Sequence, residues 1–182
     1  GDVTDRASMD VACADIDAVL FLVHAMDGQP DFAAREAAGA TTVRDAAAGA
    51  GVQRILYLGG LGDEKDQLSK HLRSRHEVGR LLAEGSVPVT ELRAGVVIGS
   101  GSVSFEMLRH LTEVLPVMTT PRWVKTRTQP IGVRDVLRTI VGALAVEETA
   151  GRIIEIGGPD VLSYAEMMQR YAAIAGLRRR II

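Results

Sequence analysis

A run of apolar side chains that no polar residue interrupts constrains the fold more than any other feature of this sequence. Residues 18–23 read Ala-Val-Leu-Phe-Leu-Val, and such a run predicts a parallel strand buried on both faces. An alanine-rich segment follows at 31–50, which we expect to form a helix that Gly51 ends. Residues 54–58 then give a second buried strand. Strand, helix and strand in series are the pattern of an α/β protein with a parallel sheet.

The remaining segments continue this alternation. Ser69 is placed to cap a helix that runs to about residue 84, and Gly85 is placed to end it. Further along we expect a third strand region at 87–92 and 95–98, a helix at 104–115, a loop at 119–130, a helix at 133–146, a fourth strand at 152–156 and a last helix capped by Ser163. The sequence therefore predicts an α/β protein with a doubly wound parallel sheet in one partial domain over residues 1–182.

Asp135 stands at the start of the helix expected at 133–146. The apolar residues that follow it, among them Val136 and Ile140, have helical spacing. A carboxylate near the N-terminal end of a helix is stabilising. We therefore expect Asp135 to begin or cap this helix and to take no part in chemistry.

A glycine-rich turn between the first strand and the first helix is the usual mark of a dinucleotide-binding domain. The nearest match here, Gly-Ser-Gly-Ser-Val-Ser at 99–104, follows a strand region but lacks the third glycine and the acidic residue about 20 positions later. We interpret it as a strand-to-helix turn near the ligand. The sequence opens at Gly1 as if just after a strand and closes on the apolar Ile181 and Ile182. We expect a partial sheet from which the first βαβ units, with the glycine-rich motif, are absent.

The strand expected at 18–23 lacks a neighbour on one side. In the doubly wound order the first strand of the sheet lies next to it, and this sequence supplies none. The run carries no charge and no proline, so its free edge is prone to pair with another chain. We therefore expect one of two outcomes: the missing strands are present in the native molecule, or two chains form a homodimer through the exposed sheet edge or through uncovered apolar faces.

Composition excludes several classes of partner. The formal net charge of −2 offers no basic surface for nucleic acid, and we interpret the arginines at 178–180 as a solvated helix end. The single cysteine, Cys13, cannot form an internal disulfide and fits a buried position in a reducing compartment. No apolar stretch approaches the roughly 20 residues of a membrane span, and no signal peptide is recognisable. We expect a soluble cytoplasmic protein and assign no residue to a metal site.

Several short segments, taken together and in order, carry a family resemblance. They are 21–26 (Phe-Leu-Val-His-Ala-Met), 57–61 (Tyr-Leu-Gly-Gly-Leu), 69–77, 90–99, 130–136 (Pro-Ile-Gly-Val-Arg-Asp-Val) and 155–159 (Glu-Ile-Gly-Gly-Pro). With these the chain resembles the atypical short-chain dehydrogenases/reductases, in their epimerase-like and NmrA-like branch. The resemblance covers nearly the whole chain. It implies a partial Rossmann-like domain over residues 1–182 that binds NAD or NADP, with residues 100–182 contributing its substrate-side part.

The resemblance also implies a cofactor site at the carboxyl ends of the strands, where parallel sheets bind their ligands. Its residues would be Asp2 and Val3 beside the adenine, Val23 and His24 under the ribose, Gly59 and Gly60 at the end of the family's fifth strand, and Ala94, Gly95 and Val97 near the nicotinamide. Two of them have an ordinary structural alternative. Asp2 fits a turn or helix cap, and His24 fits a strand-end histidine bonded to the backbone.

The catalytic pair of the family is replaced in this chain. Active members carry a tyrosine and a lysine four residues apart on the helix after the fifth strand, on one helix face. Alignment of 69–75 places His71 at the tyrosine position and Arg75 at the lysine position, and Gly59 or Gly60 stands where a serine or threonine is usual. Arg75 could bind ribose hydroxyls or phosphate with its planar fork, and His71 could donate a proton near neutral pH. The same residues also fit a solvated basic helix face.

Two functions stay open at this point. One is an NAD(P)-dependent oxidoreductase or epimerase acting on an unidentified small carbonyl or nucleotide-sugar-like compound. The other is a non-catalytic sensor that holds NADP and reports redox state to a partner. The replacement of all three usual catalytic residues favours the sensor. A third possibility belongs to this chain alone: without the first strands it binds no dinucleotide.

Overall fold

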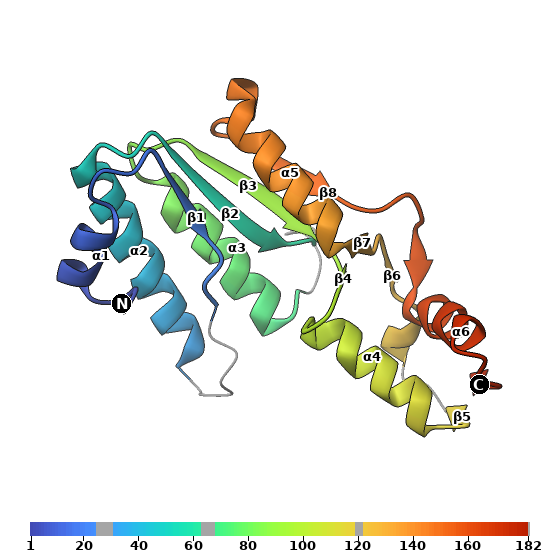
Figure 1. Cartoon of the computed structure of the whole chain (residues 1–182). Coiled ribbons are helices and arrows are strands. Elements are labelled where there is room, and N and C mark those ends of the chain that lie inside the picture. Colours follow the sequence, from blue (N-terminus) through green and yellow to red (C-terminus); the bar gives the residue numbers. More distant parts are fainter. Residues whose placement is uncertain (25–30, 63–67, 119–121, 182) are drawn as a thin grey trace. The chain divides into compact units, whose positions relative to one another are not determined.

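The computed structural model describes residues 1–24, 31–62, 68–118 and 122–181. The chain divides into two compact units (Figure 1). The first unit comprises residues 1–93 and 139–155, and the second comprises residues 94–138 and 156–182. The single domain over 1–182, with 100–182 as its substrate-side part, stays a prediction.

The first unit is built on a parallel sheet with helices packed against it. Strand order among the described residues is β1-β2-β3-β8, where the strands are β1 (Ala18–Phe21), β2 (Arg54–Gly60), β3 (Val89–Ala94) and β8 (Ile153–Ile156). β1 and β2 run parallel with Ala18 opposite Arg54 and Phe21 opposite Tyr57. This arrangement confirms the predicted α/β fold with a doubly wound, Rossmann-like sheet.

Three helices belong wholly to the first unit: α1 (Arg6–Ala12), α2 (Phe32–Ala50) and α3 (Lys70–Ala83). α2 packs against both α1 and α3, and α3 packs against β2. Their shared core contains Ala40, Val43, Ile55, Val78 and Leu82, all at most 3% exposed. Burial of such side chains stabilises a fold by about 1.5–3 kcal/mol for each large apolar residue.

Local sequence signals fix the ends of these helices as expected. The Asp5 carboxylate accepts the N–H groups of Ala7 and Ser8 at the start of α1. Gly51 ends α2 with a φ of 74°, a conformation that glycine adopts without strain. Cys13 lies just after α1, is buried as expected, and has a thiol pKa that burial raises.

The second unit contains short paired strands and two packed helices. Its helices are α4 (Val103–Val114) and α6 (Tyr164–Ile174), which contact each other, and the 3-10 turn η1 (Arg122–Lys125). Its strand pairs are β4 (Val97–Ile98) with β7 (Ile131–Gly132), β5 (Val117–Met118) with β10 (Arg180–Ile181), and β6 (Arg127–Thr128) with β9 (Leu162–Ser163). Leu108, Met118 and Met168 lie in its apolar core. Ser163 and Glu166 form a capping box at the start of α6.

α5 (Val133–Ala145) is shared, since residues from Thr139 onward belong to the first unit, and the 3-10 turn η2 (Glu147–Thr149) follows it. Asp135 lies in the first turn of α5 and accepts a hydrogen bond from Arg138 at 3.0 Å. Asp135 thus lies in the first turn as expected, although the helix begins two residues earlier at Val133, and the expectation that it takes no part in chemistry stays a prediction. Among the helices of the described ranges, none is both long and apolar enough to cross a bilayer.

Four sequence expectations need correction. β1 ends at Phe21, since Leu22 and Val23 are about half exposed beyond it. Residues 95–98 do not continue the third strand but supply β4, which pairs with β7. The expected loop at 119–130 contains η1 and β6, and its residues 119–121 lie outside the described part.

The fourth correction concerns the C-terminal arginines and isoleucines. Arg179 is not a solvated helix end: its Nη2 donates to the Glu113 carbonyl oxygen at 2.7 Å, and its Nε donates to that of Thr112. These carbonyls belong to the last turn of α4, whose final carbonyl groups have no partner within the helix. The backbone of Ile181 pairs with Met118 in the strand pair of β5 and β10, so the chain does not end as a helix there.

The exposed flank of β1 gives a prediction about association. Within the described residues β1 pairs only with β2, and Leu20 is 44% exposed. An uncharged free edge invites pairing with a second chain, so light scattering should show the mean mass of this 182-residue chain rising with concentration. Leu20→Lys places a charge on the edge and should shift the mass toward that of a monomer. A wild-type monomer that survives dilution and unfolds cooperatively would contradict the prediction.

Candidate functional site

The two residues aligned with the family's catalytic pair lie on the first two turns of α3, beside the end of β2. Ser69 begins the helix, because its Oγ accepts the N–H of Leu72 at 3.3 Å. A Cβ added to Gly60, the last residue of β2, would lie 3.3 Å from Cδ of Arg75. The stem of Arg75 therefore runs against the backbone of Gly60. Arg75 and Gly60 come together at the carboxyl end of β2, the edge where parallel sheets bind ligands.

His71 is held by an aromatic neighbour that the sequence analysis missed. Its ring stacks on Phe32 with centroids 4.7 Å apart and an interplanar angle of 29°. Phe32 is the first residue of α2, so the stack joins the N-terminal ends of α2 and α3. His71 is exposed, and its ring nitrogens can meet solvent or a ligand. Only a weak indication of this contact was present in the sequence, namely an aromatic residue at the start of the helix that follows β1.

Gly59 faces a buried carboxylate. A Cβ at Gly59 would lie 2.8 Å from Oε1 of Glu91, and a Cβ at Gly79 would lie 2.5 Å from Oε2 of the same residue. Glu91 is 3% exposed and pairs with Arg93, with 2.7 Å between Oε1 and Nε. The carboxylate thus fills a notch between β2 and α3 that exists because both positions are glycine.

Gly60 is closed to a side chain as well. A Cβ there would lie 2.6 Å from Cδ2 of Leu72, as well as against Arg75. Serine or threonine at position 59 or 60 would therefore require its neighbours to move. Sequence reasoning found the two glycines but not Glu91, whose signal was an acidic residue inside a strand region expected to be buried.

Asp2 and Val3 take part in local structure. Oδ1 of Asp2 accepts the N–H of Thr4 at 2.8 Å and the Thr4 hydroxyl at 2.7 Å, and these bonds lower the pKa of the Asp2 carboxyl. Asp2 is therefore a turn residue, one of its two alternatives, while Asp5 caps the helix. Cγ2 of Val3 lies 3.0 Å from where a Cβ on Gly39 of α2 would stand.

Val23 and His24 follow β1 and are exposed. Nδ1 of His24 lies 3.4 Å from the carbonyl oxygen of Leu22, which is the backbone-bonded arrangement expected as its alternative role. Ala25 and Met26, which completed this segment of the family resemblance, lie outside the described residues.

Ala94, Gly95 and Val97 belong to the second unit. Ala94 is the buried last residue of β3, Gly95 contacts the Thr128 side chain, and Val97 begins β4. The segment 99–104 forms the expected strand-to-helix turn, with Gly101 at a φ of 81° and the Ser102 hydroxyl donating to the Val97 carbonyl at 2.6 Å.

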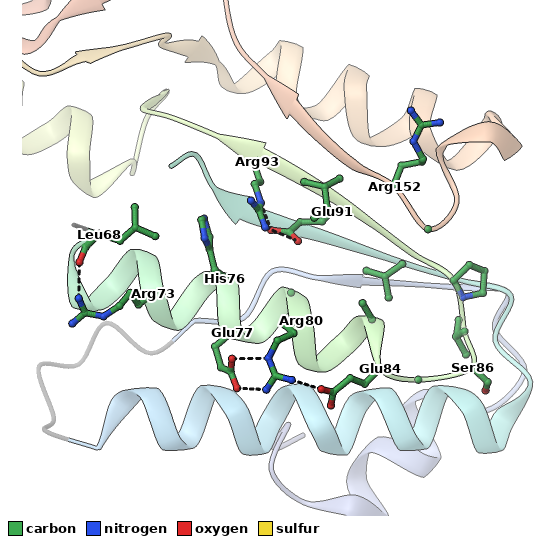
Figure 2. Close-up of a pocket in the computed structure, with 18 residues that line it drawn as sticks. Leu68, Arg73, His76, Glu77, Arg80, Glu84, Ser86, Glu91, Arg93 and Arg152 are labelled. Carbon is green, nitrogen blue, oxygen red and sulfur yellow. Dashed lines mark hydrogen bonds and ion pairs between the residues drawn. The ribbon is translucent and has the colours of Figure 1, made fainter. Parts of the chain in front are cut away.

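A groove of about 990 Å³ lies elsewhere in the first unit (Figure 2). α3, β3 and the start of β8 line it, and neither His71 nor Arg75 is among its lining residues. Figure 2 shows Glu91 and Arg93 on β3 facing α3, with His76 projecting from α3 toward them. The groove is therefore separate from the residues aligned with the cofactor site.

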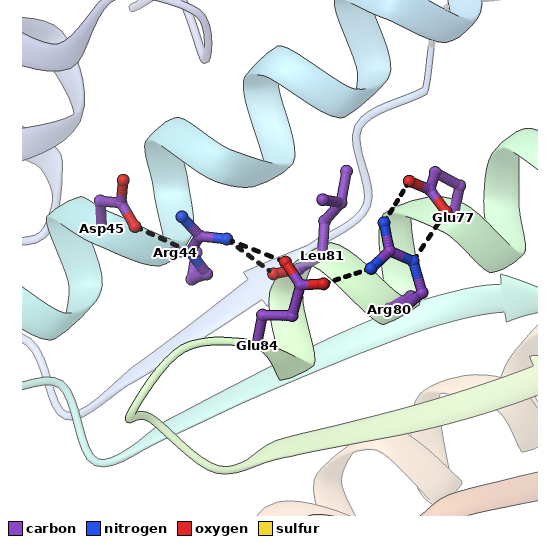
Figure 3. A network of polar contacts seen from close by, with 6 residues as sticks. All are labelled: Arg44, Asp45, Glu77, Arg80, Leu81 and Glu84. Atoms are coloured by element: carbon purple, nitrogen blue, oxygen red, sulfur yellow. Dashed lines mark hydrogen bonds and ion pairs between the residues drawn. The ribbon is translucent and has the colours of Figure 1, made fainter.

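A network of ion pairs joins α2 to α3 on the outside of the first unit (Figure 3). Arg44 of α2 contacts Asp45 at 2.7 Å and Glu84 at 3.5 Å, and Arg80 of α3 contacts Glu77 and the same Glu84. The hydrogen bond from Arg80 lowers the pKa of Glu77. Arg44 is mostly buried at 18% exposed, but its partners and Arg80 are about half exposed, so the network is expected to contribute little to stability. In the described ranges, no cluster of three or more histidine, cysteine or acidic side chains could hold a metal ion.

No family model and no curated protein matches the sequence. The structure, however, is similar to many solved ones. One is MoeE5 in complex with UDP-glucose and NAD, which is 18% identical at a TM-score of 0.80; the match covers all of this chain and 69% of that one.

Two further structures are similar over the whole of this chain. A nucleoside-diphosphate-sugar epimerase from Staphylococcus aureus is 17% identical with a TM-score of 0.80, and 61% of its length is covered. A short-chain dehydrogenase/reductase superfamily protein from Agrobacterium tumefaciens with bound NAD is 17% identical with a TM-score of 0.79, and 72% is covered. The chain thus spans between three-fifths and three-quarters of these proteins, and it shares their Rossmann-type fold.

The notch occupied by Glu91 gives a prediction on stability. Gly79→Ala adds a methyl group against the Glu91 carboxylate and should lower the free energy of unfolding by about 1–3 kcal/mol, as overpacking does. Gly142→Ala is the matched control, since Gly142 lies in α5 and a Cβ there meets nothing within 4 Å. The control should be neutral or stabilising by up to about 1 kcal/mol. Urea unfolding of both variants measures the difference, and equal effects would contradict the proposed packing.

Proposed function

We propose that this chain is the greater part of an NAD(P)-binding protein of the atypical short-chain dehydrogenase/reductase type. The observation that carries the proposal is the position of Arg75 against Gly60 at the carboxyl end of a parallel strand. A guanidinium there is suited to ribose hydroxyls or phosphate. The proposal has further support in the fold, because MoeE5 and the Agrobacterium tumefaciens protein were solved with NAD.

The activity we propose is that of an oxidoreductase or an epimerase-like enzyme on a small carbonyl or nucleotide-sugar-like substrate. The support is analogy: MoeE5 was solved with UDP-glucose and with UDP-glucuronic acid, and WbmG from Bordetella bronchiseptica with NAD and UDP. A bound nicotinamide would supply hydride transfer. In that hydride transfer His71 would donate or accept the proton on the substrate oxygen, and Phe32 would hold its ring in place.

A second candidate is a non-catalytic NADP-binding sensor. The crowding at Gly59 and Gly60 favours it, because a serine or threonine there, as the family resemblance would require, would make Glu91 or Leu72 move. An arginine at position 75 also does not reproduce every role of a lysine there, because its planar guanidinium differs from an ammonium group in shape and hydrogen bonding. Under either candidate we place Asp2, Val3, Val23, His24, Ala94, Gly95 and Val97 around the dinucleotide. We further propose a cytoplasmic protein, consistent with its lone buried thiol, and a homodimer through β1.

Removing the Arg75 side chain tests dinucleotide binding. Arg75→Ala in the full-length protein should weaken NADH or NADPH binding by roughly 1.5–3 kcal/mol, the scale of a hydrogen bond to a charged group. Arg73→Ala is the matched control, since Arg73 lies on the same helix but donates to the Leu68 carbonyl and lines the groove. Calorimetry should show near-wild-type affinity for the control. Equal affinity for both variants would indicate that Arg75 lies on a solvated helix face and does not bind the dinucleotide.

Replacing His71 separates the two candidate functions. His71→Phe keeps an aromatic ring that can stack on Phe32 but removes the exchangeable proton. Under the enzyme proposal it should abolish turnover of carbonyl compounds, monitored as NAD(P)H absorbance, while dinucleotide affinity stays within about twofold. If the wild-type protein binds NAD(P)H without oxidising it on any carbonyl compound or nucleotide sugar of a panel, the sensor proposal replaces the enzyme proposal.

A further inference from the structure

Two hydrogen bonds cross between β2 and α3 in opposite directions. The Tyr57 hydroxyl on β2 donates to the backbone carbonyl oxygen of Arg75 on α3 at 3.0 Å. Nε2 of His76 on α3 lies 3.1 Å from the backbone carbonyl oxygen of Gly60 on β2. The two bonds thus connect the last residues of β2 with consecutive residues of α3. We call this pair of bonds the β2–α3 clamp.

Both donors of the clamp are fixed by their surroundings. Tyr57 is 3% exposed and His76 is 7% exposed. Burial raises the pKa of the Tyr57 hydroxyl, which therefore keeps its proton and donates. A carbonyl oxygen only accepts, so Nε2 of His76 carries a proton and donates as well. Both donor side chains are largely shielded from solvent, so the loss of either bond is expected to cost free energy.

The clamp acts on the residue that carries the proposed dinucleotide contact. Tyr57 holds the Arg75 backbone directly, and His76, the next residue, holds the Gly60 backbone against which the Arg75 stem lies. The Arg75 side chain has several rotatable bonds and its stem lies against Gly60, so the position of its backbone influences where its guanidinium can reach. Holding a ligand-binding group in place through buried neighbours raises affinity by lowering the cost of ordering it.

We propose that His76 is a positioning residue for dinucleotide binding: through the Gly60 carbonyl it holds the end of β2 against α3 and so sets the place of Arg75. This inference rests on the proposed function. His76 itself does not touch the dinucleotide in this proposal. The imidazole works as a donor across a packed interface, and its partner is main chain.

The test compares variants that differ only in the donor. His76→Leu removes the donor, whereas His76→Gln keeps an N–H near the position of Nε2. Ser74→Ala is the matched control, since Ser74 is similarly buried on α3 but bonds Glu36 of α2. NADH and NADPH affinities are measured by calorimetry, and unfolding by urea, in the full-length protein. We expect His76→Leu to weaken binding by at least about fivefold and the other two variants to stay within about twofold.

Several outcomes overturn the proposal. One is wild-type affinity in His76→Leu, and another is equal loss in the leucine and glutamine variants, which would make the role one of packing. A comparable loss in Ser74→Ala would do the same. Where His76→Leu does not fold, Tyr57→Phe takes its place, because it removes only the hydroxyl of the clamp and should also weaken binding by at least about fivefold.

Amide hydrogen exchange separates this proposal from the proposed function. If the wild-type protein binds neither NADH nor NADPH, the proposed function fails. The clamp is then judged on the amides of residues 73–78 and 58–61. Faster exchange there in His76→Leu, but not in His76→Gln or Ser74→Ala, supports the positioning role. Unchanged exchange in His76→Leu overturns it.

Discussion

The close approach of α3 to the end of β2 is the constraint on which the first unit depends. Glycine at positions 59 and 79 removes two side chains from the interface, and the Glu91 carboxylate enters the space they leave. The apolar contacts of Val78 and Leu82 continue the same interface toward the core. Hydrogen bonds and apolar contacts therefore act on one surface, and the helix cannot rotate or shift without breaking both.

The buried pair of Glu91 and Arg93 contributes specificity more than stability. Taking both charges out of water costs free energy that their attraction largely offsets. The two residues are two positions apart on β3 and share one face of the sheet. A shift of one residue in the pairing of β3 would turn both charges to the opposite face. The charged pair thus disfavours alternative registers in a strand that is otherwise uniformly buried.

Much of the fold followed from local signals in the sequence. Continuous apolar runs located β1 and β2, and Ser69, Gly51 and Ser163 marked helix ends, because capping depends on residues within a few positions of one another. The errors came from contacts between distant segments. β4 is a strand because β7 lies beside it, and the arginine at 179 caps α4 from more than 60 positions away. Neither partner is visible in a local pattern.

The residues of the candidate site were likewise predicted only in part from the sequence. Alignment by family resemblance brought His71, Arg75, Gly59 and Gly60 forward, and the structure gathers them on α3 and at the end of β2. The family resemblance could not identify Phe32 and Glu91, because their roles depend on contacts with residues distant in the sequence. The notch at Glu91 also has an evolutionary consequence. A hydroxyl at position 59 is accommodated more readily when residue 91 is smaller, and a smaller residue 91 removes the carboxylate that pairs with Arg93. Substitutions at positions 59 and 91 are therefore expected to be coupled, with a double change costing less than the sum of the two single changes.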